Sequence, residues 1–213
     1  MNSLAGRLMS IVAGQLGHPS GPLGKVVALM LNRGNRAAVA AAVEAAEVAA
    51  GEVAADIGFG GGVGLPLLLE RAGADGVVYG VEISTDMLTR AKSRHTAEIG
   101  AGRLRLLAGS LDDLPFDADS LDAAITVNTL YFVADLDRAC AELARVLRPK
   151  GRLVIGVGDP DAMAKMPFTP YGFRLRPVAD IQAALGRAGF DVEDEPLPGG
   201  PVPFHLLVAR QHV

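Results

Sequence analysis

Short apolar runs alternate with longer helical patterns through most of this chain, and this alternation limits the possible folds more than any other feature. From Val53 onward, each apolar run is followed by a stretch with helical spacing. Such alternation is typical of repeated βα units, and near-continuous apolar runs are typical of strands buried on both faces. We therefore expect an α/β fold, a mostly parallel sheet with helices on both faces. The predicted strands are Val53–Ile57, Val77–Val81, Leu104–Ala108, Ala123–Val127 and Leu153–Val157.

Helical spacing also covers the start of the chain, and two further strands are expected near its end. The last two strands, Phe190–Glu193 and His205–Ala209, are joined by a Pro- and Gly-rich segment that is too short for a helical crossover. They should therefore pair antiparallel. The predicted helices are Leu4–Leu16, Leu23–Ala49, Val63–Arg71, Thr85–His95, Leu136–Leu147 and Val178–Ala188.

Charge and hydropathy exclude two classes of partner. The formal net charge is −4, which gives no broad positive field for nucleic acid. No stretch has the roughly 18 uninterrupted apolar residues of a membrane helix, and the first residues lack the blocks of a signal peptide. We expect a cytoplasmic protein without integral membrane association or nucleic-acid partner, and a homodimer stays possible.

A glycine-rich turn follows the first predicted strand, over Asp56–Gly64. Glycines there let the backbone bend tightly and approach a bound molecule. The dinucleotide fingerprint G-x-G-x-x-G is not met, since its third position falls on Val63 or Leu65. The carboxylate of Asp56 suits a cation better than a pyrophosphate. A nicotinamide cofactor is therefore disfavoured.

The sequence Asp-Ile-Gly-Phe-Gly-Gly-Gly from Asp56 to Gly62 resembles the D-x-G-x-G-x-G loop of class I (Rossmann-like) methyltransferases, which use S-adenosylmethionine. The resemblance implies that Gly58 and Gly60 line the methionine portion of this cofactor and that Asp56 orients it. Glu82 ends the second strand, 26 positions after Asp56, where a carboxylate can accept both ribose hydroxyls. By the same resemblance, Ile83 and Met87 lie near the adenosine. The loop's predicted cofactor contacts also include Phe59 and Gly62.

Other segments resemble the family in the same order, over about Val53 to Val157. After the third strand, Gly109–Phe116 resembles the loop at the adenine edge, with Ser110 at the usual aspartate position. Either Ser110, or the Leu111 backbone with Asp112, would then contact the adenine amino group. Arg145–Ile155 resembles the R-V-L-K-P-G-G-x-L segment, with Lys150 in place of the first glycine.

Asn128-Thr129-Leu130-Tyr131 follows the fourth strand, where an acceptor would face the cofactor. It lacks the prolines of the N-P-P-Y signature of base-modifying enzymes and resembles small-molecule members instead. We expect Asn128 at the cofactor, and Tyr131 and His18 as candidate catalytic residues. The alternatives are that the Tyr131 ring only packs over the fourth strand and that His18 is an exposed loop residue. No metal ligand set is predicted.

The segment 163–177 combines aromatic, methionine and cationic residues where this family inserts acceptor-recognition elements. It is predicted either as a substrate lid or as a loop that seals the sheet edge. In the first case Tyr131, Phe168 and Tyr171 would enclose a partly apolar acceptor, and Arg174 would be available for an anionic group.

The sequence therefore predicts one methyltransferase domain over residues 1–213, which transfers a methyl group to a small molecule by in-line displacement. Residues 1–50 would form helices covering the site, 51–157 the cofactor-binding core, and 158–213 the acceptor-side segment and terminal hairpin. Two alternatives remain, a non-catalytic module that binds S-adenosylmethionine or S-adenosylhomocysteine, and a nicotinamide-dependent oxidoreductase.

Overall fold

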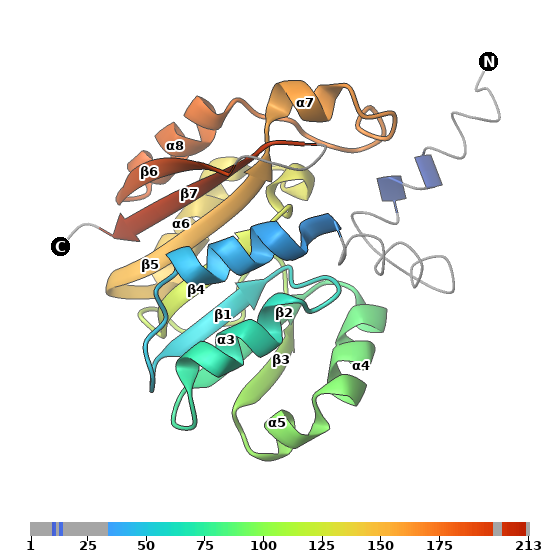
Figure 1. The fold of residues 1–213 in the computed structure, drawn as a ribbon. Helices are drawn as coiled ribbons and strands as arrows, with labels where there is room; N and C mark the ends of the chain where they lie inside the picture. Colours follow the sequence, from blue (N-terminus) through green and yellow to red (C-terminus); the bar gives the residue numbers. More distant parts are fainter. Residues whose placement is uncertain (1–9, 12, 15–33, 198–201, 212–213) are drawn as a thin grey trace.

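The computed structural model describes residues 10–11, 13–14, 34–197 and 202–211. Its centre is a seven-stranded sheet with the order β3-β2-β1-β4-β5-β7-β6, drawn in Figure 1. All neighbouring pairs from β3 to β5 are parallel, and β7 runs antiparallel to both β5 and β6. The expected α/β class, mostly parallel sheet and antiparallel terminal hairpin are confirmed. The strands are β1 (Val53–Ile57), β2 (Val77–Glu82), β3 (Leu104–Ala108), β4 (Leu121–Val127), β5 (Leu147–Gly158), β6 (Phe190–Leu197) and β7 (Phe204–Gln211).

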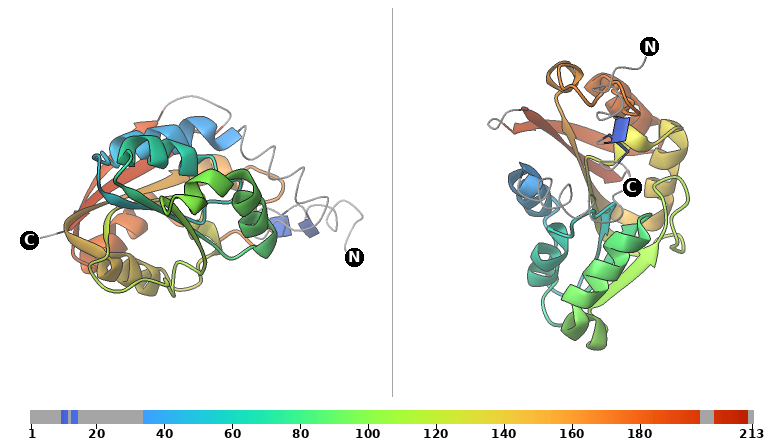
Figure 2. Two further views of the ribbon diagram at one scale, coloured as in Figure 1. Left: turned by 90° about the horizontal axis from the view of Figure 1, so that it is seen from below. Right: turned by 90° about the vertical axis from the view of Figure 1, so that its right-hand side faces the viewer.

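Helices cover both faces of this sheet, as Figure 2 shows. A helix over residues 34–45, with α3 and α4, packs on one face around Ala42, Leu68 and Met87. On the other face α6 and α8 pack around Leu143 and Leu185. The helices are α3 (Gly64–Ala72), α4 (Thr85–Arg94), α5 (Thr96–Gly100), α6 (Leu136–Val146), α7 (Pro160–Ala164) and α8 (Val178–Arg187), with a 3-10 turn η1 (Leu130–Phe132).

Five of the seven strands extend beyond their predicted bounds, and β5 and β6 extend furthest. β5 begins at Leu147, because the chain continues through Pro149 and Gly151 as an irregular strand with a register shift opposite β4. β6 extends through acidic residues to Leu197 because it is an edge strand that pairs only with β7. An edge strand also accommodates Pro196, since its missing N–H can face away from the partner.

The structure describes half of the residues in the two predicted N-terminal helices, and the second helix ends at residue 45, before the predicted Ala49. Within Leu23–Ala49, residues 34–45 are helical, and within Leu4–Leu16 the described residues 10–11 and 13–14 are helical. Three short elements were not predicted, namely α5, η1 and α7. The start of α7 could have been recognised from the sequence, because Asp followed by Pro is typical of a helix N-terminus. Asp159 caps the helix by accepting from Ala162 N–H at 2.8 Å, and Pro160 follows in the first turn.

In the described part of the chain, no helix has the length and apolar character needed to cross a membrane.

Candidate active site

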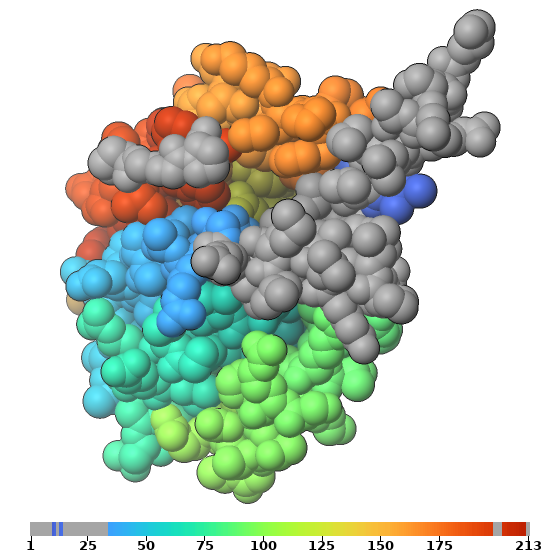
Figure 3. Space-filling view, turned by 45° about the vertical axis from the view of Figure 1, so that its right-hand side comes forward, coloured from blue at the N-terminus to red at the C-terminus, as the bar shows by residue number. Residues whose placement is uncertain are grey.

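A cavity of about 700 Å³ opens at the carboxyl ends of the strands, where β1 has β2 on one side and β4 on the other. Such a switch in strand order leaves a crevice for ligands in open α/β sheets. The loops after β1, β2, β3 and β4 form one side of the cavity. The helix over 34–45, the segment after β5 (residues 159–177) and the ends of β6 and β7 form the rest. In Figure 3 the green α4–α5 region and the orange segment after β5 stand at opposite ends of one face, with the blue helix over 34–45 between them.

The glycine-rich loop after β1 depends on backbone conformations that favour glycine. Gly58, Gly60 and Gly62 have φ angles of 74°, 51° and 76°. Gly58 also has no room for a side chain, because a Cβ there would approach Thr129 Oγ1 to 2.5 Å. Gly58 N–H donates to the Val81 carbonyl at 2.8 Å, which fixes the loop beside the end of β2. The loop therefore presents backbone, with little side-chain bulk, to the cavity.

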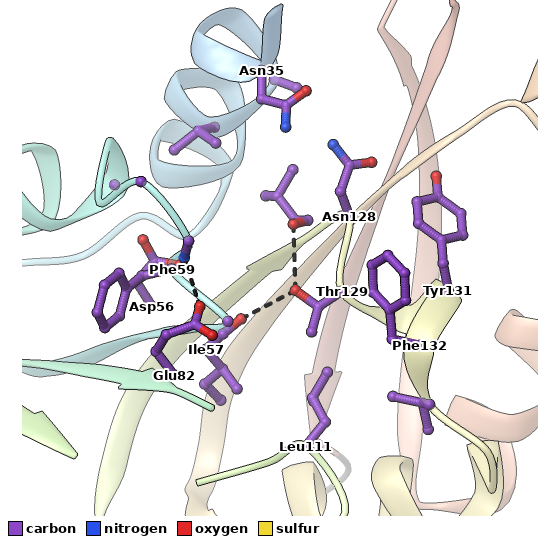
Figure 4. Close-up of a pocket in the computed structure, with 18 of the residues that line it drawn as sticks. Asn35, Asp56, Ile57, Phe59, Glu82, Leu111, Asn128, Thr129, Tyr131 and Phe132 are labelled. Atoms are coloured by element: carbon purple, nitrogen blue, oxygen red, sulfur yellow. Dashed lines mark hydrogen bonds between the residues drawn. The ribbon is translucent and has the colours of Figure 1, made fainter. Parts of the chain in front are cut away.

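Glu82 ties this loop to β2 through its carboxylate. Its Oε2 accepts from Gly60 N–H at 2.9 Å, and its Oε1 accepts from the N–H groups of Ile83 and Ser84 at 2.9 and 3.0 Å. The side chain is buried and lines the cavity (Figure 4). Glu82 thus holds the loop in place and also offers its remaining oxygen lone pairs to a ligand.

Asp56 lies at the end of β1 under the loop, and its carboxyl group lines the cavity with only 5% of the residue exposed. Burial, and secondarily the nearby negative charge of Glu82, raise the pKa of Asp56 to about 7. In the described part of the structure, no hydrogen bond satisfies this carboxyl group. A cation bound in the cavity would favour its ionised form.

Ser110 and Asp112 act as a pair on the loop after β3. The Ser110 hydroxyl donates to Asp112 Oδ1 at 2.6 Å, and this bond is the main cause that lowers the pKa of Asp112. Arg138 of α6 donates to the Asp112 carbonyl at 2.9 Å, and both Ser110 and Asp112 line the cavity. The two alternatives for the adenine contact are therefore coupled in one hydrogen-bonded unit.

Aromatic rings line the other half of the cavity. Phe173 lies at the centre of this group, with ring centroids 5.0 Å from Phe132 and 5.4 Å from both Tyr131 and Phe168. The Tyr131 hydroxyl accepts from Gly158 N–H at 2.6 Å, and burial raises its pKa to about 12. Tyr131 therefore keeps its proton at neutral pH, and any catalytic part it plays is that of a neutral phenol.

Most of the predicted site residues meet in this cavity. Gly62 and Met87 do not line it, since Gly62 faces Leu65 and Met87 is buried in the core under α4. Tyr171 is exposed and also lies outside the lining, and His18 lies outside the described residues. The predicted residues that line the cavity are Asp56, Gly58, Phe59, Gly60, Glu82, Ile83, Ser110, Leu111, Asp112, Asn128, Tyr131 and Phe168.

Arg174 does not reach the cavity lining either. Its backbone N–H donates to the Tyr131 carbonyl at 2.9 Å, and the residue borders a separate small pocket behind η1. The cavity is also lined by Asn35, Thr129, Phe132 and Phe173, which were not predicted as site residues. Thr129 and Phe173 lie within segments that the sequence already singled out, and Phe132 directly follows the first of them. Asn35 carries no local signal, because only the packing of its helix brings it to the site.

Comparison with known proteins shows which family and which relatives this chain resembles in sequence. Residues 55–155 match the family described as "Methyltransferase domain". The O-methyltransferase cnsE of Penicillium expansum is 33% identical over 153 residues, which cover 68% of this chain and 54% of that protein. The 2-phytyl-1,4-naphtoquinone methyltransferase of Trichormus variabilis is 34% identical over 105 residues, or 49% and 46% of the two chains.

The fold itself is shared with solved structures. A SAM dependent methyltransferase from Aquifex aeolicus superposes with a TM-score of 0.70, covering 95% of this chain and 98% of that one at 19% identity. The chain spans about half the length of the two curated relatives named above.

Proposed function

We propose that this chain, whose residues 55–155 form a class I methyltransferase domain, transfers a methyl group from S-adenosylmethionine to a small, largely apolar acceptor. The observation that carries the proposal is the division of one cavity into an acidic half at the loops after β1, β2 and β3 and an aromatic half at η1 and the segment after β5. The first half suits a cationic nucleoside, and the second suits an apolar molecule.

The residues present fit S-adenosylmethionine. The carboxyl groups of Asp56 and Glu82 line the cavity, and Asp56 is buried without a hydrogen bond from the described residues. This charge suits the ammonium and sulfonium groups of the cofactor and opposes a pyrophosphate. When bound, the cofactor would supply an electrophilic methyl group. Asp56 and the loop from Gly58 to Gly60 would hold its methionine part, Glu82 its ribose, and Ile83 with the Ser110–Asp112 pair its adenine.

The contribution of the chain would be mainly alignment and exclusion of water. Positioning two reactants in a productive geometry is worth roughly 7 to 11 kcal/mol in well-oriented systems. Arg174 N–H, in the segment after β5, donates to the Tyr131 carbonyl of η1 at 2.9 Å. The Thr129 hydroxyl, just before η1, donates to the Ile57 carbonyl at the end of β1 at 3.5 Å. These bonds would keep the acceptor at a fixed distance from the cofactor half.

The names of the relatives support a small-molecule acceptor, since one is called a 2-phytyl-1,4-naphtoquinone methyltransferase and another an O-methyltransferase. We further propose that the protein acts in the cytoplasm as a single domain. A homodimer stays a prediction.

Ligand binding tests the proposal directly. Thermal-shift and calorimetric titrations should show that S-adenosylmethionine and S-adenosylhomocysteine stabilise the protein and that NAD does not, because a ligand stabilises the folded state that binds it. Formation of S-adenosylhomocysteine in the presence of acceptors then separates an enzyme from a binding module. Stabilisation by NAD alone would overturn the proposal.

The variant Glu82→Ala should weaken cofactor binding at least about tenfold, since it removes both a ligand contact and the anchor of Gly60 N–H. Glu70→Ala is the matched control, because Glu70 is an exposed carboxylate on α3 outside the cavity lining. Calorimetry measures both affinities, and circular dichroism checks that the variants fold. An unchanged titration for Glu82→Ala would remove Glu82 from the site.

A further inference from the structure

Two side-chain amides face the cavity beside its aromatic half. Asn35 lies on the helix over 34–45 and Asn128 follows β4, and both are half-buried lining residues. In Figure 4 their amides turn toward each other, and Tyr131 and Phe132 lie on the same side as Asn128. Among residues 34–197 and 202–211, no hydrogen bond joins either side-chain amide to another group. As far as the described residues are concerned, each amide therefore keeps both donors and an acceptor for a ligand.

The backbone at Asn128 is adapted to this position. Its φ angle is 61°, a left-handed conformation that asparagine adopts more readily than most residues. Asn128 N–H donates to the Gly156 carbonyl of β5 at 2.8 Å, which fixes the residue at the sheet edge. The Asn128 side chain therefore reaches the cavity from a backbone that is hydrogen-bonded to β5.

The aromatic rings favour a flat ligand. Phe132 meets Phe173 at an interplanar angle of 61°, and Phe168 meets it at 47°. Rings tilted in this way leave faces and edges available for edge-to-face or offset stacking with another ring. An aromatic acceptor would therefore add to the cluster rather than disturb it.

The charges around the cavity oppose an anionic ligand. The charged residues among the described lining are Asp56, Glu82 and Asp112, all acidic. The cations of the segment after β5, Lys165, Arg174 and Arg176, are not among the lining residues. An anion would lose hydration there and meet charges of its own sign.

We propose that the aromatic half binds a planar, uncharged, aromatic acceptor that carries a hydroxyl or carbonyl group, and that Asn35 and Asn128 hold this polar group. The inference rests on the proposed function, because the cofactor occupies the acidic half. Asn35 is then a specificity-determining residue supplied by the N-terminal part of the chain.

Three probes with one ring system test the inference by calorimetry on protein saturated with S-adenosylhomocysteine at pH 7. We expect 2-naphthol to bind more tightly than naphthalene by about 3- to 10-fold, the value of one or two modest hydrogen bonds. The anion 2-naphthoate should bind at least about tenfold more weakly than 2-naphthol. A preference for 2-naphthoate, or equal binding of naphthalene and 2-naphthol, would overturn the proposal.

Two variants assign the effect to the amides. Asn35→Leu keeps the size of the side chain, and Asn128→Gly tolerates the positive φ angle. Each should lower the affinity for 2-naphthol about 3- to 10-fold and leave that for naphthalene unchanged. Gln182→Leu on α8 is the control, a half-buried amide outside the cavity lining. Unchanged 2-naphthol affinity in both cavity variants would contradict the assignment.

The protein is titrated with S-adenosylhomocysteine before the aromatic probes are added, and this first titration tests the proposed function separately from the acceptor inference. If S-adenosylhomocysteine does not bind, the proposed function is wrong. If S-adenosylhomocysteine binds but the protein does not distinguish the aromatic probes, only the acceptor inference is wrong.

Discussion

The carboxyl group of Asp56 is buried at the edge of the cavity, and this makes the stability of the protein depend on pH. The pKa of the folded state, about 7, lies above the ordinary value of 3.8 because burial disfavours the charged form. Between these two pH values the folded protein keeps the proton that the unfolded chain has released. The unfolded state then binds fewer protons, so the free energy of unfolding falls as pH rises from about 4 to 7.

Asp56→Asn should remove this dependence, because the amide stays neutral. Relative to the parent protein, the variant should gain stability as pH rises through this window, by at most about 1.4 kcal/mol per pH unit. Urea unfolding at pH 4, 5, 6 and 7 measures the difference. Asp75→Asn, in the exposed turn before β2, is the control and should run parallel to the parent. Parallel curves for Asp56→Asn would mean that Asp56 is already ionised at low pH.

Gly58 is the loop position that tolerates a side chain least. Gly58→Ala combines a positive φ angle of 74° with an approach of Cβ to Thr129 Oγ1 at 2.5 Å. We expect a loss of about 2 to 4 kcal/mol in the free energy of unfolding, from the left-handed backbone and the overpacking together. Thermal and urea unfolding measure this loss.

Gly186→Ala provides the contrast for Gly58→Ala. Gly186 lies inside α8, where nothing is within 4 Å of an added Cβ and the φ angle is not positive. This variant should stabilise the protein by roughly 0.5 to 1 kcal/mol, because alanine is the better helix residue. Equal effects of the two substitutions would show that the loop does not hold the conformation described.

At the scale of elements, Arg176 fastens the segment after β5 onto η1. Its Nη1 donates to the Leu130 carbonyl at 2.8 Å and its Nη2 to the Val133 carbonyl at 2.6 Å, at the two ends of the turn that carries Tyr131 and Phe132. These bonds hold the aromatic half of the cavity together. Arg176 is therefore a positioning residue that acts through η1.

Arg176→Met should cost about 2 to 4 kcal/mol of stability, since it leaves two carbonyls without a charged donor. It should also weaken 2-naphthol binding while leaving S-adenosylhomocysteine affinity within about twofold, a split that uniform destabilisation would not produce. Arg187→Met is the control, because its ion pair with Asp137 is exposed and such pairs contribute about 0 to 1 kcal/mol. Equal losses of both ligands would contradict the positioning role.

The accuracy of the sequence predictions followed the local strength of each signal. β1 and β3 have the predicted bounds because their apolar runs are short and closed by polar or glycine residues. β5 was predicted to begin at Leu153, since Pro149, Lys150 and Gly151 indicate a break. Lys150 instead takes a φ angle of 68° at the position where the family has glycine, and the strand continues through it.

At the scale of the whole molecule, the topology decided which parts of the site could be predicted. The loops after the parallel strands meet at one sheet edge by necessity, so Asp56, Glu82, Ser110 and Asn128 could be grouped from their order alone. The helix over 34–45 reaches the same cavity only through its packing on the sheet face. Asn35 therefore could not be assigned from the sequence, and neither could the inward burial of Met87.

The position of Tyr131 in the aromatic cluster also gives the protein a natural optical reporter. The chain has no tryptophan and three tyrosines, so its near-ultraviolet emission comes from Tyr79, Tyr131 and Tyr171. Of these, Tyr131 lines the cavity, whereas Tyr79 packs against Phe116 and Tyr171 is exposed. An aromatic molecule that enters beside Phe173 would quench one emitter of the three, so occupancy could be followed in the unlabelled, unaltered chain.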